Sequence, residues 1–350
     1  MKVFVRADSS VEIGTGHIMR CLVLADFLRT RGAEVAFVCR RLPGDACPLV
    51  EGKGYRVHRL PLGEDASRQA DAEATVDALR EAAGIVDWVV VDHYRLGETW
   101  ERSLRRQAHN IMVIDDLADR RHDSDLLLDQ NYYDDAEKRY LGLLPENCRR
   151  FLGPRYALLR EEFRAAKRTL RARDGTVGRV LVFFGGTDPT NETAKALVAL
   201  ASMSGRSFAV DVVVGSGNPF RMDIQETCRV MEGVAYHCQV DNMAQFIASA
   251  DLALGAGGTT TWERCCLGLP TITVVTAANQ GETTDALERA GVTWNLGWHE
   301  GVTAAMMAEA IRRGCREPAA LLEMGRRAIG VMGGNDDAGQ NALLDALEQR

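Results

Sequence analysis

The fold of this chain is decided by residues 2–17, KVFVRADSSVEIGTGH. The apolar run Lys2–Arg6 predicts a buried strand, and the glycine-containing segment after it leads into the expected helix Gly16–Arg31. A strand that passes through a glycine turn into a helix is the repeating unit of a parallel α/β sheet. The opening of the chain therefore predicts a Rossmann-like domain.

The same alternation of short apolar runs and amphipathic stretches continues along the chain, which predicts parallel sheets covered by helices. In the first half the expected strands are Lys2–Arg6, Glu34–Cys39, Tyr55–Leu60, Trp88–Asp92, Asn110–Ile114 and Asp125–Asp129. In the second half they are Arg179–Phe184, Phe208–Val214, Val234–Cys238, Asp251–Leu254 and Pro270–Val275. One helix of the second half is expected to start at Asp188-Pro189, because a capping residue before a proline is typical of a helix N-terminus.

The length of the chain indicates two domains. It has 350 residues, more than the roughly 250–300 residues at which one hydrophobic core stops growing. A charged helix over Arg155–Arg173 and a flexible hinge over Asp174–Gly178 are expected to form the divide. The predicted fold class is α/β, with two Rossmann-like, doubly wound parallel-sheet domains and an interdomain cleft. The predicted boundaries are 1–154 for the first domain, 155–178 for the linker, 179–335 for the second domain and 336–350 for a terminal helix, which could pack back on the first.

Composition excludes several classes of function. With 42 basic and 49 acidic residues the net charge is −7, which disfavours a nucleic-acid partner because such proteins carry a basic balance or face. No apolar run reaches the roughly 18–20 residues that span a bilayer, and charged residues interrupt any signal-peptide core within residues 1–30. Nine cysteines without a C-x-x-C pair are typical of free thiols in a reducing compartment, not of a zinc site. We expect a cytoplasmic protein with no membrane partner and no metal, in an oligomeric state that the sequence leaves open.

Polar side chains follow four of the strands expected in the first half. They are Asp8, Ser9 and Ser10 after the first strand, Asp92, His93 and Tyr94 after the fourth, Asp115 and Asp116 after the fifth, and Gln130 and Asn131 after the sixth. Parallel sheets bind ligands just beyond the carboxyl ends of their strands. The clustering therefore predicts a site at that edge of the first sheet.

The glycine turn before the first helix supports this site. Met19 replaces the third glycine of the dinucleotide fingerprint, and no acidic residue ends the second strand, so a Rossmann oxidoreductase is disfavoured. Gly14 and Gly16 let backbone N–H groups approach an anionic ligand, although a tight turn also needs glycine. His17 lies in the first helical turn, where the helix dipole favours the neutral ring. A neutral imidazole can act as a general base, or it can simply cap its own turn.

Two strand ends of the second half are rich in glycine, at Gly185-Gly186-Thr187 and at residues 255–261, GAGGTTT. Neither contains the lysine of a Walker A loop. In the second, backbone N–H groups, threonine hydroxyls and a helix terminus suit a diphosphate. Glu263 follows about one turn later, where its carboxylate could accept both hydroxyls of a ribose or could be an ordinary exposed helical glutamate.

Several blocks of sequence, in order, resemble a known family of nucleotide-sugar hydrolases. These blocks are RADSS (6–10), IGTGHIMRC (13–21), VDHY (91–94), IDD (114–116), YALLREEF (156–163) and FGGTD (184–188). The family is that of the UDP-2,4-diacetamido-2,4,6-trideoxy-β-L-altropyranose hydrolases of pseudaminic acid biosynthesis, and the resemblance spans about residues 1–330. The pattern GAGG (255–258), Glu263, GLP (268–270) and NQ (279–280) also resembles the nucleotide-sugar-binding stretch of glycosyltransferases with two Rossmann domains, the GT-B type.

The resemblance implies an activity and roles for individual residues. The anomeric C–O bond of the UDP-sugar is hydrolysed with inversion, and UDP and the free sugar are released without a cofactor or metal, for pseudaminic acid and flagellin glycosylation. His17 would be the general base and Tyr94 would assist beside the sugar. The diphosphate would lie over Gly257, Gly258 and Thr259, and Glu263 would bind the ribose. The further substrate-binding residues implied are Asp8, Ser9, Gly14, Gly16, Arg20, Asp115, Gly186, Thr260, Asn279 and Gln280.

Two other functions fit part of the same pattern. A UDP-sugar-dependent glycosyltransferase of the same fold would need a bound acceptor, and residues 40–80 show no hydrophobic or basic stripe for a lipid or glycan. A non-catalytic nucleotide-sugar sensor would keep the glycine loops but not the polar strand ends, whereas His17, Tyr94 and the Asp115-Asp116 pair are present. The residues therefore favour the hydrolase.

Overall fold

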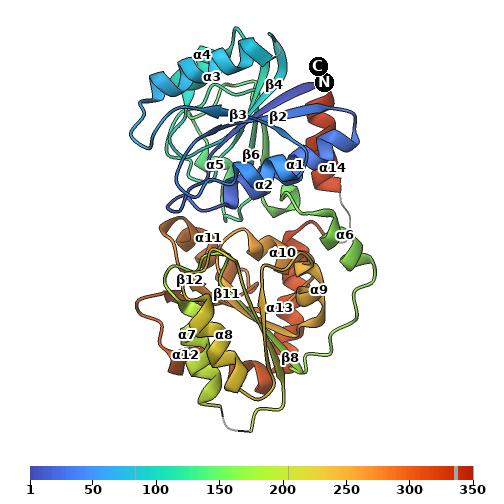
Figure 1. Ribbon diagram of the computed structural model, residues 1–350. Coiled ribbons are helices and arrows are strands. Elements are labelled where there is room, and N and C mark those ends of the chain that lie inside the picture. The colour runs from blue at the N-terminus through green and yellow to red at the C-terminus, as the bar shows by residue number, and fades with distance from the viewer. Residues whose placement is uncertain (83, 204, 335–337, 350) are drawn as a thin grey trace. The chain divides into compact units, whose positions relative to one another are not determined.

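The computed structural model describes residues 1–82, 84–203, 205–334 and 338–349, which form two compact units (Figure 1). Among these residues, unit 1 contains Met1–Asn131, Asp135–Leu158 and 338–349, and unit 2 contains Tyr132–Asp134 and 159–334. Residues 335–337, where the predicted boundary before the terminal helix falls, lie outside the described residues.

Unit 1 is built on a parallel sheet with the strand order β3-β2-β1-β4-β5-β6-β7. Its strands are β1 (Lys2–Ala7), β2 (Glu34–Arg40), β3 (Arg56–Leu60), β4 (Val86–Asp92), β5 (Ala108–Ile114), β6 (Leu126–Asp129) and β7 (Arg149–Leu152). The six strands predicted in the first half are confirmed. The sequence does not predict β7, because its residues RRFL contain too few apolar positions to form a recognisable run. The strand order reverses between β1 and β4, which is where such sheets bind ligands.

Helices cover both faces of this sheet. They are α1 (Gly16–Thr30), α2 (Cys47–Gly52), α3 (Arg68–Ala82), α4 (Glu98–Leu104), α5 (Ala136–Arg139), the 3-10 turn η1 (Pro154–Tyr156) and α14 (Ala338–Glu348). Alternation along β1 sends Val3 and Val5 into the core beneath α1 and α14, while Phe4 joins the opposite core beneath α3 and α4.

The last helix packs on unit 1 although it is remote from that unit in sequence. Leu343, Leu344 and Leu347 of α14 are buried in the same core as β1 and α1. The Trp88 indole N–H on β4 donates to the Leu347 carbonyl at 2.9 Å. Unit 1 therefore needs both ends of the chain to complete its core.

Unit 2 repeats the architecture with the strand order β10-β9-β8-β11-β12-β13. Its strands are β8 (Arg179–Phe183), β9 (Ala209–Val214), β10 (Val234–Cys238), β11 (Leu252–Ala256), β12 (Thr271–Val275) and β13 (Trp294–Trp298). Its helices are α6 (Glu161–Arg168), α7 (Glu192–Ala201), α8 (Arg221–Val230), α9 (Met243–Ser249), α10 (Thr260–Cys266), η2 (Ala278–Gln280), α11 (Gly281–Arg289), α12 (Ala304–Arg316) and α13 (Pro318–Val331). The five strands predicted here are confirmed. The sequence does not predict β13, a half-exposed edge strand whose WNLGW sequence includes glycine.

Two sequence expectations about local structure in this half are wrong. The segment Arg155–Arg173 is not one helix: α6 covers only Glu161–Arg168, because the apolar residues before it are buried in extended backbone. After α6, the Arg173 guanidinium donates to the carbonyls of Ile247, Ala250 and Leu267, which fixes that stretch to unit 2. Helix α7 begins at Glu192 and not at Pro189, since the Asp188 carboxylate accepts the N–H groups of Glu192 and Thr193.

The described residues contain no helix long and apolar enough to cross a membrane. All nine cysteines are free thiols, and only Cys238 and Cys315 are exposed.

We predict that Leu343→Ala destabilises unit 1. Leu343 is fully buried in the core that α14 shares with α1 and β1, and truncation of such a side chain typically costs about 2–5 kcal/mol through lost burial and the cavity left behind. Urea unfolding would measure the loss. Leu322→Ala on α13, where the side chain is exposed, is the matched control and should change stability by less than about 0.5 kcal/mol. Equal effects of the two substitutions would contradict the packing of α14.

Candidate functional site

The carboxyl edge of the unit 1 sheet gathers the polar residues that the sequence singles out. β1 and β4 are neighbours, with Ala7 opposite Asp92, so the segments that leave these strands emerge side by side. After β1, the chain passes through residues 8–15 and enters α1 at Gly16. The switch point of strand order thus lies between the glycine turn and the VDHY segment.

His17, Asp92 and Arg20 form a buried hydrogen-bonded group at this point. The His17 Nδ1 lies 2.6 Å from Asp92 Oδ1. The Arg20 Nε donates to Asp92 Oδ2 and its Nη2 donates to Asp92 Oδ1, both at 2.6 Å. His17 and Arg20 lie one turn apart on α1, so one helix face presents both groups to the end of β4.

The charge state of Asp92 determines what His17 can do. Burial opposes ionisation of Asp92, but the Arg20 guanidinium and His17 hold the pKa of its carboxyl well below the usual range. An ionised carboxylate only accepts hydrogen bonds, so the neutral imidazole carries its proton on Nδ1 and leaves Nε2 as a proton acceptor. This arrangement of a base oriented by a carboxylate is the one used in hydrolytic triads.

Asp92 belongs to the polar cluster that the sequence predicts at the strand ends, but the sequence assigns it no catalytic or binding role. Its position as the last residue of β4, directly before His93 and Tyr94, was the available signal. Arg20, which the resemblance implies in substrate binding, has its guanidinium engaged with Asp92 and, at 3.2 Å, with Asp116. Its contacts are therefore those of a residue that positions Asp92.

Tyr94 lies beside His17. The two rings meet edge to face, with their centroids 4.6 Å apart and their planes at 75°. His17 is 7% exposed and Tyr94 is 37% exposed, so the imidazole is largely shielded from solvent while the phenol that contacts it remains accessible. The structure thus brings together the two residues predicted to be catalytic.

Asp8 and Ser9 are buried and engaged within unit 1. The Asp8 carboxylate pairs with Arg6 at 2.6 Å and with Arg40 at 2.7 Å, and His93 Nε2 lies 3.2 Å away. Ser9 Oγ accepts the Ala46 N–H at 2.8 Å. These contacts hold the segments after β1, β2 and β4 together. The polar atoms of both side chains are thus engaged with other residues of unit 1.

The glycine turn itself is open. Gly14 has a φ of +75°, a conformation that favours glycine, and its N–H donates to the Ser10 carbonyl at 2.9 Å. Apart from the adjoining residues and the backbone of its own helix, a Cβ on Gly16 would meet no atom within 4 Å, and the residue is exposed. The backbone beside His17 can therefore be approached by a ligand.

Asp115 belongs to a neighbouring carboxylate cluster. One of its oxygens pairs with Arg120 at 3.0 Å, and the other accepts the Tyr140 hydroxyl at 3.1 Å. The same hydroxyl lies 3.0 Å from Asp129 Oδ2 at the end of β6. Burial, with the charges of Asp116 and Asp115 added, raises the pKa of Asp129 to about 7. This cluster therefore contains a carboxyl that titrates near neutral pH.

The carboxyl edge of the unit 2 sheet carries the two glycine loops. Gly186 follows β8 and contacts Gly215 closely. A Cβ on Gly215 would lie 2.4 Å from the Gly186 carbonyl oxygen. Gly257 follows β11, and a Cβ there would lie 2.4 Å from Thr284 Oγ1. Because β8 and β11 are neighbours at the switch point of this sheet, both loops lie at the expected ligand-binding edge.

The remaining predicted residues of unit 2 surround the second loop. A Cβ on Gly258 would lie 3.7 Å from Gln280 Nε2, and Gln280 Oε1 accepts the Thr276 N–H at 3.0 Å. Asn279 is exposed beside it on η2. Thr259 is exposed and Thr260 half-buried at the start of α10.

Glu263 on α10 is paired within unit 2. Its Oε1 lies 3.1 Å from Arg160 Nη2, and its side chain is 19% exposed. Burial raises the pKa of the Glu263 carboxyl, while the Arg160 cation opposes that rise. Arg160 also pairs with Glu162 at 2.5 Å, so a ribose that binds Glu263 would compete with an ion pair between neighbouring segments.

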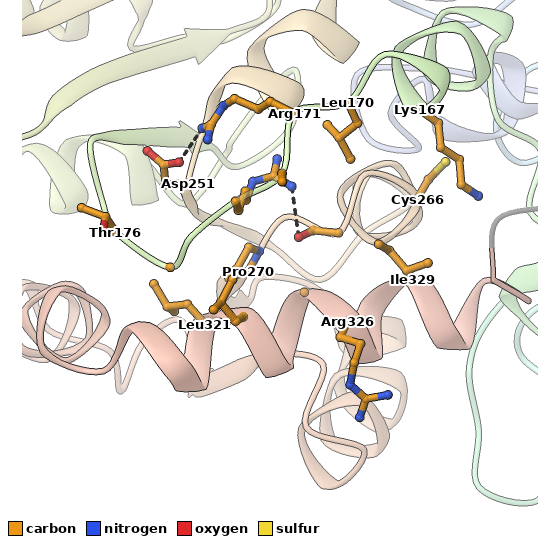
Figure 2. Close-up of a pocket in the computed structure, with 16 residues that line it drawn as sticks. Lys167, Leu170, Arg171, Thr176, Asp251, Cys266, Pro270, Leu321, Arg326 and Ile329 are labelled. Atoms are coloured by element: carbon orange, nitrogen blue, oxygen red, sulfur yellow. Dashed lines mark hydrogen bonds and ion pairs between the residues drawn. The ribbon is translucent and has the colours of Figure 1, made fainter.

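A cavity of about 370 Å³ lies at the amino-terminal edge of the unit 2 sheet, opposite the edge that carries the glycine loops (Figure 2). Asp251 and Pro270, which precede β11 and β12, line it together with Ile329 of α13. Its charged groups are used within the unit, since Arg171 pairs with Asp251 and Arg173 donates to backbone carbonyls. We therefore assign no chemistry to this cavity.

No group of three or more His, Cys, Asp or Glu side chains among the described residues is arranged to hold a metal ion.

Comparisons with known proteins agree with this architecture. Residues 180–338 match the model of the glycosyltransferase family 28 C-terminal domain. The uncharacterized protein MJ1062 of Methanocaldococcus jannaschii is 25% identical over 288 residues, which are 78% of this chain and 55% of that protein. The UDP-2,4-diacetamido-2,4,6-trideoxy-β-L-altropyranose hydrolase of Campylobacter jejuni is 28% identical over 248 residues, which are 71% of this chain and 81% of that enzyme.

The structural comparison gives the fold. The crystal structure of MurG from Acinetobacter baumannii aligns with a TM-score of 0.69 at 12% identity, covering 100% of this chain and 99% of that one. Together with the family 28 match, this shows a GT-B fold. The predicted α/β class with two Rossmann-like, parallel-sheet domains is confirmed.

We predict that Asp129→Asn changes the pH dependence of stability. Because the folded-state pKa of Asp129 is raised to about 7, above the value near 4 of an unfolded chain, the wild type loses stability as pH rises from about 4 to about 7. An asparagine does not titrate, so the variant should gain about 1–3 kcal/mol relative to wild type between pH 5 and pH 8.

Urea unfolding at the two pH values would measure this difference. The control is Asp77→Asn, where the carboxylate is exposed, and it should show no such change. A stability difference between Asp129→Asn and wild type that is the same at pH 5 and pH 8 would contradict the raised pKa.

Proposed function

We propose that this protein hydrolyses a UDP-sugar at the anomeric C–O bond, with UDP-2,4-diacetamido-2,4,6-trideoxy-β-L-altropyranose as the substrate and pseudaminic acid biosynthesis as the context. The observation that carries the proposal is the His17–Asp92–Arg20 group at the switch point of unit 1. The similarity to the Campylobacter hydrolase, which is 28% identical over 71% of the chain, supports the choice of substrate.

In the proposed reaction, His17 Nε2 takes a proton from water, and the water oxygen attacks the anomeric carbon with inversion. The bond between that carbon and the β-phosphate oxygen breaks, and UDP leaves with the electron pair. General-base assistance of this kind contributes about 10²–10⁴-fold to rate. Asp92 holds the ring in the required tautomer and stabilises the imidazolium that forms, and Tyr94 excludes bulk water beside the ring.

Unit 2 supplies the nucleotide site in this proposal. The diphosphate binds at the loop of Gly257, Gly258 and Thr259, and Glu263 accepts the ribose hydroxyls after it exchanges its pairing with Arg160. The match to a glycosyltransferase C-terminal domain over residues 180–338 supports this assignment. Asn279 and Gln280 lie next to the loop and are proposed to contact the phosphate or sugar.

A glycosyltransferase is the second candidate, and the family 28 match is the observation that favours it. The same base would then deprotonate an acceptor hydroxyl in place of water. The two functions differ in whether UDP is released when no acceptor is present.

We predict that His17→Ala loses nearly all turnover but retains UDP binding. UDP release would be followed with UDP-2,4-diacetamido-trideoxy-altrose and, separately, with UDP-N-acetylglucosamine, without an acceptor and without added metal. The wild type should hydrolyse the first, and His17→Ala should be slower by about 10²–10⁴-fold because the base is missing. His109→Ala, an exposed histidine at the other end of the unit 1 sheet, is the control and should retain full activity.

The outcomes separate the hypotheses. Turnover that begins only after an acceptor is added would identify a transferase. Loss of UDP binding together with activity in His17→Ala would show that His17 is structural.

We predict that Asp92→Asn also lowers kcat while KM changes little. An amide at this position can donate to Nδ1, which favours the tautomer with its proton on Nε2 and removes the acceptor that the reaction needs. A loss of about 10²–10⁴-fold in kcat is expected. Circular dichroism would check folding, since Arg20 also loses a charged partner. A variant that is folded and retains full kcat would exclude Asp92 from orienting the base.

A further inference from the structure

Arg264 is a buried cation directly behind the second glycine loop. It lies in the last turn of α10 and is 2% exposed. Its Nη2 donates to the Ala256 carbonyl at 2.7 Å and to Thr261 Oγ1 at 3.0 Å, and its Nε has no hydrogen-bond partner. Among the described residues, no carboxylate pairs with it at ion-pair distance, although Glu263 is its neighbour in sequence. Burial lowers the pKa of Arg264 to about 10, so the group remains cationic at neutral pH.

Glu263 attracts this cation only from beyond ion-pair distance, and a buried charge without a carboxylate in direct contact is unfavourable for the free protein. Desolvation of an ion is costly, and a carboxylate normally offsets it in protein interiors. Two neutral acceptors offset only part of that cost here. A negatively charged group that binds near this guanidinium would supply the missing compensation.

The position of the guanidinium identifies where such a group would bind. A Cβ on Gly255 would lie 2.7 Å from Arg264 Nη1, so the side chain runs along the backbone that leads from β11 into the glycine loop. The Ala256 carbonyl is directed at Arg264. In a trans peptide the carbonyl and the following N–H point in opposite directions, and no cis peptide occurs among the described residues. The Gly257 N–H is therefore turned away from Arg264, toward the outer side of the loop.

The helix after the loop is short. α10 has seven residues, Thr260–Cys266, so its macrodipole is short. The full charge of Arg264 lies on the same side of the loop as this helix and is shielded from solvent. At low local dielectric such a charge acts more strongly on a nearby anion than it would in water.

We propose that Arg264 positions and electrostatically supports a diphosphate-binding loop, although it does not itself touch the ligand. Its cation lies behind the loop and compensates the negative charge of a nucleoside diphosphate on the other side. Its bond to Ala256 fixes the orientation of the Gly257 N–H. This inference rests on the proposed function, because it takes the loop of unit 2 to be the site of the diphosphate.

The test compares UDP with uridine, which lacks the phosphates. Affinities of the full chain would be measured by NMR titration for the wild type, Arg264→Met and Arg264→Lys. We expect Arg264→Met to bind UDP at least about tenfold more weakly, a loss of about 1.4 kcal/mol, while uridine affinity stays within about twofold. Arg264→Lys keeps the charge and should recover part of the UDP affinity.

Thermal unfolding of the ligand-free variants gives a second readout with the opposite sign. Replacing a buried, uncompensated charge with an apolar side chain of similar length should leave the Tm unchanged or raise it. A residue that only supports the fold would instead lower the Tm and weaken UDP and uridine equally. Arg316→Met, an exposed arginine on α12 of the same unit, is the matched control and should alter neither affinity nor Tm.

Each result decides between the hypotheses. Unchanged UDP affinity in Arg264→Met, or equal losses for UDP and uridine, would overturn the role of Arg264 and leave the proposed function standing. Absence of UDP binding by the wild type would overturn the proposed function, and the inference with it. If Arg264→Met does not fold, the inference is judged on Arg264→Lys, which should bind UDP less tightly than wild type and uridine equally well.

Discussion

The pairing of β1 with β4, and of β8 with β11, is the constraint on which both sites depend. In each sheet these are the strands between which the order reverses, so the connections that leave them diverge to opposite faces. The space between the connections is therefore not filled by a neighbouring helix. In unit 1 this space is bordered by His17 and Asp92, and in unit 2 by the loops of Gly186 and Gly257. The same topology thus places a histidine–carboxylate group at the switch point of one unit and two glycine loops at the switch point of the other.

The two units treat buried charge in different ways. In unit 1, the Asp92 carboxylate is surrounded by donors from Arg20 and His17, so its charge is satisfied before any ligand arrives. Such a group is suited to holding a ring in one orientation. In unit 2, Arg264 has only a carbonyl and a hydroxyl as acceptors, so its charge remains available to an incoming anion. In the proposed function, preorganisation of a base and attraction of a substrate require these two different electrostatic environments.

The sequence predicts the strands well because parallel, buried strands are continuous apolar runs, as in Trp88–Asp92 and Arg179–Phe184. It fails where tertiary contacts override local preference. The edge strands β7 and β13 gain their conformation from pairing with β6 and β12. The start of α7 is set by the Asp188 carboxylate, which accepts the N–H groups of Glu192 and Thr193, so the helix does not begin at Pro189. For the site, residue types at strand ends indicate His17 and Tyr94, whereas the roles of Asp92, Arg20 and Arg264 depend on long-range or side-chain contacts that spacing does not show.

The packing of α14 on unit 1 has a consequence for how the chain is made. The core around β1 and α1 receives Leu343, Leu344 and Leu347 only when the C-terminal helix has been synthesised. Residues 159–334 of unit 2 leave the ribosome earlier and need none of these leucines for their own core. On the ribosome, the unit encoded first is therefore expected to mature last, and fragments that end near residue 158 would leave the Trp88 indole and the face beneath α14 without their cover.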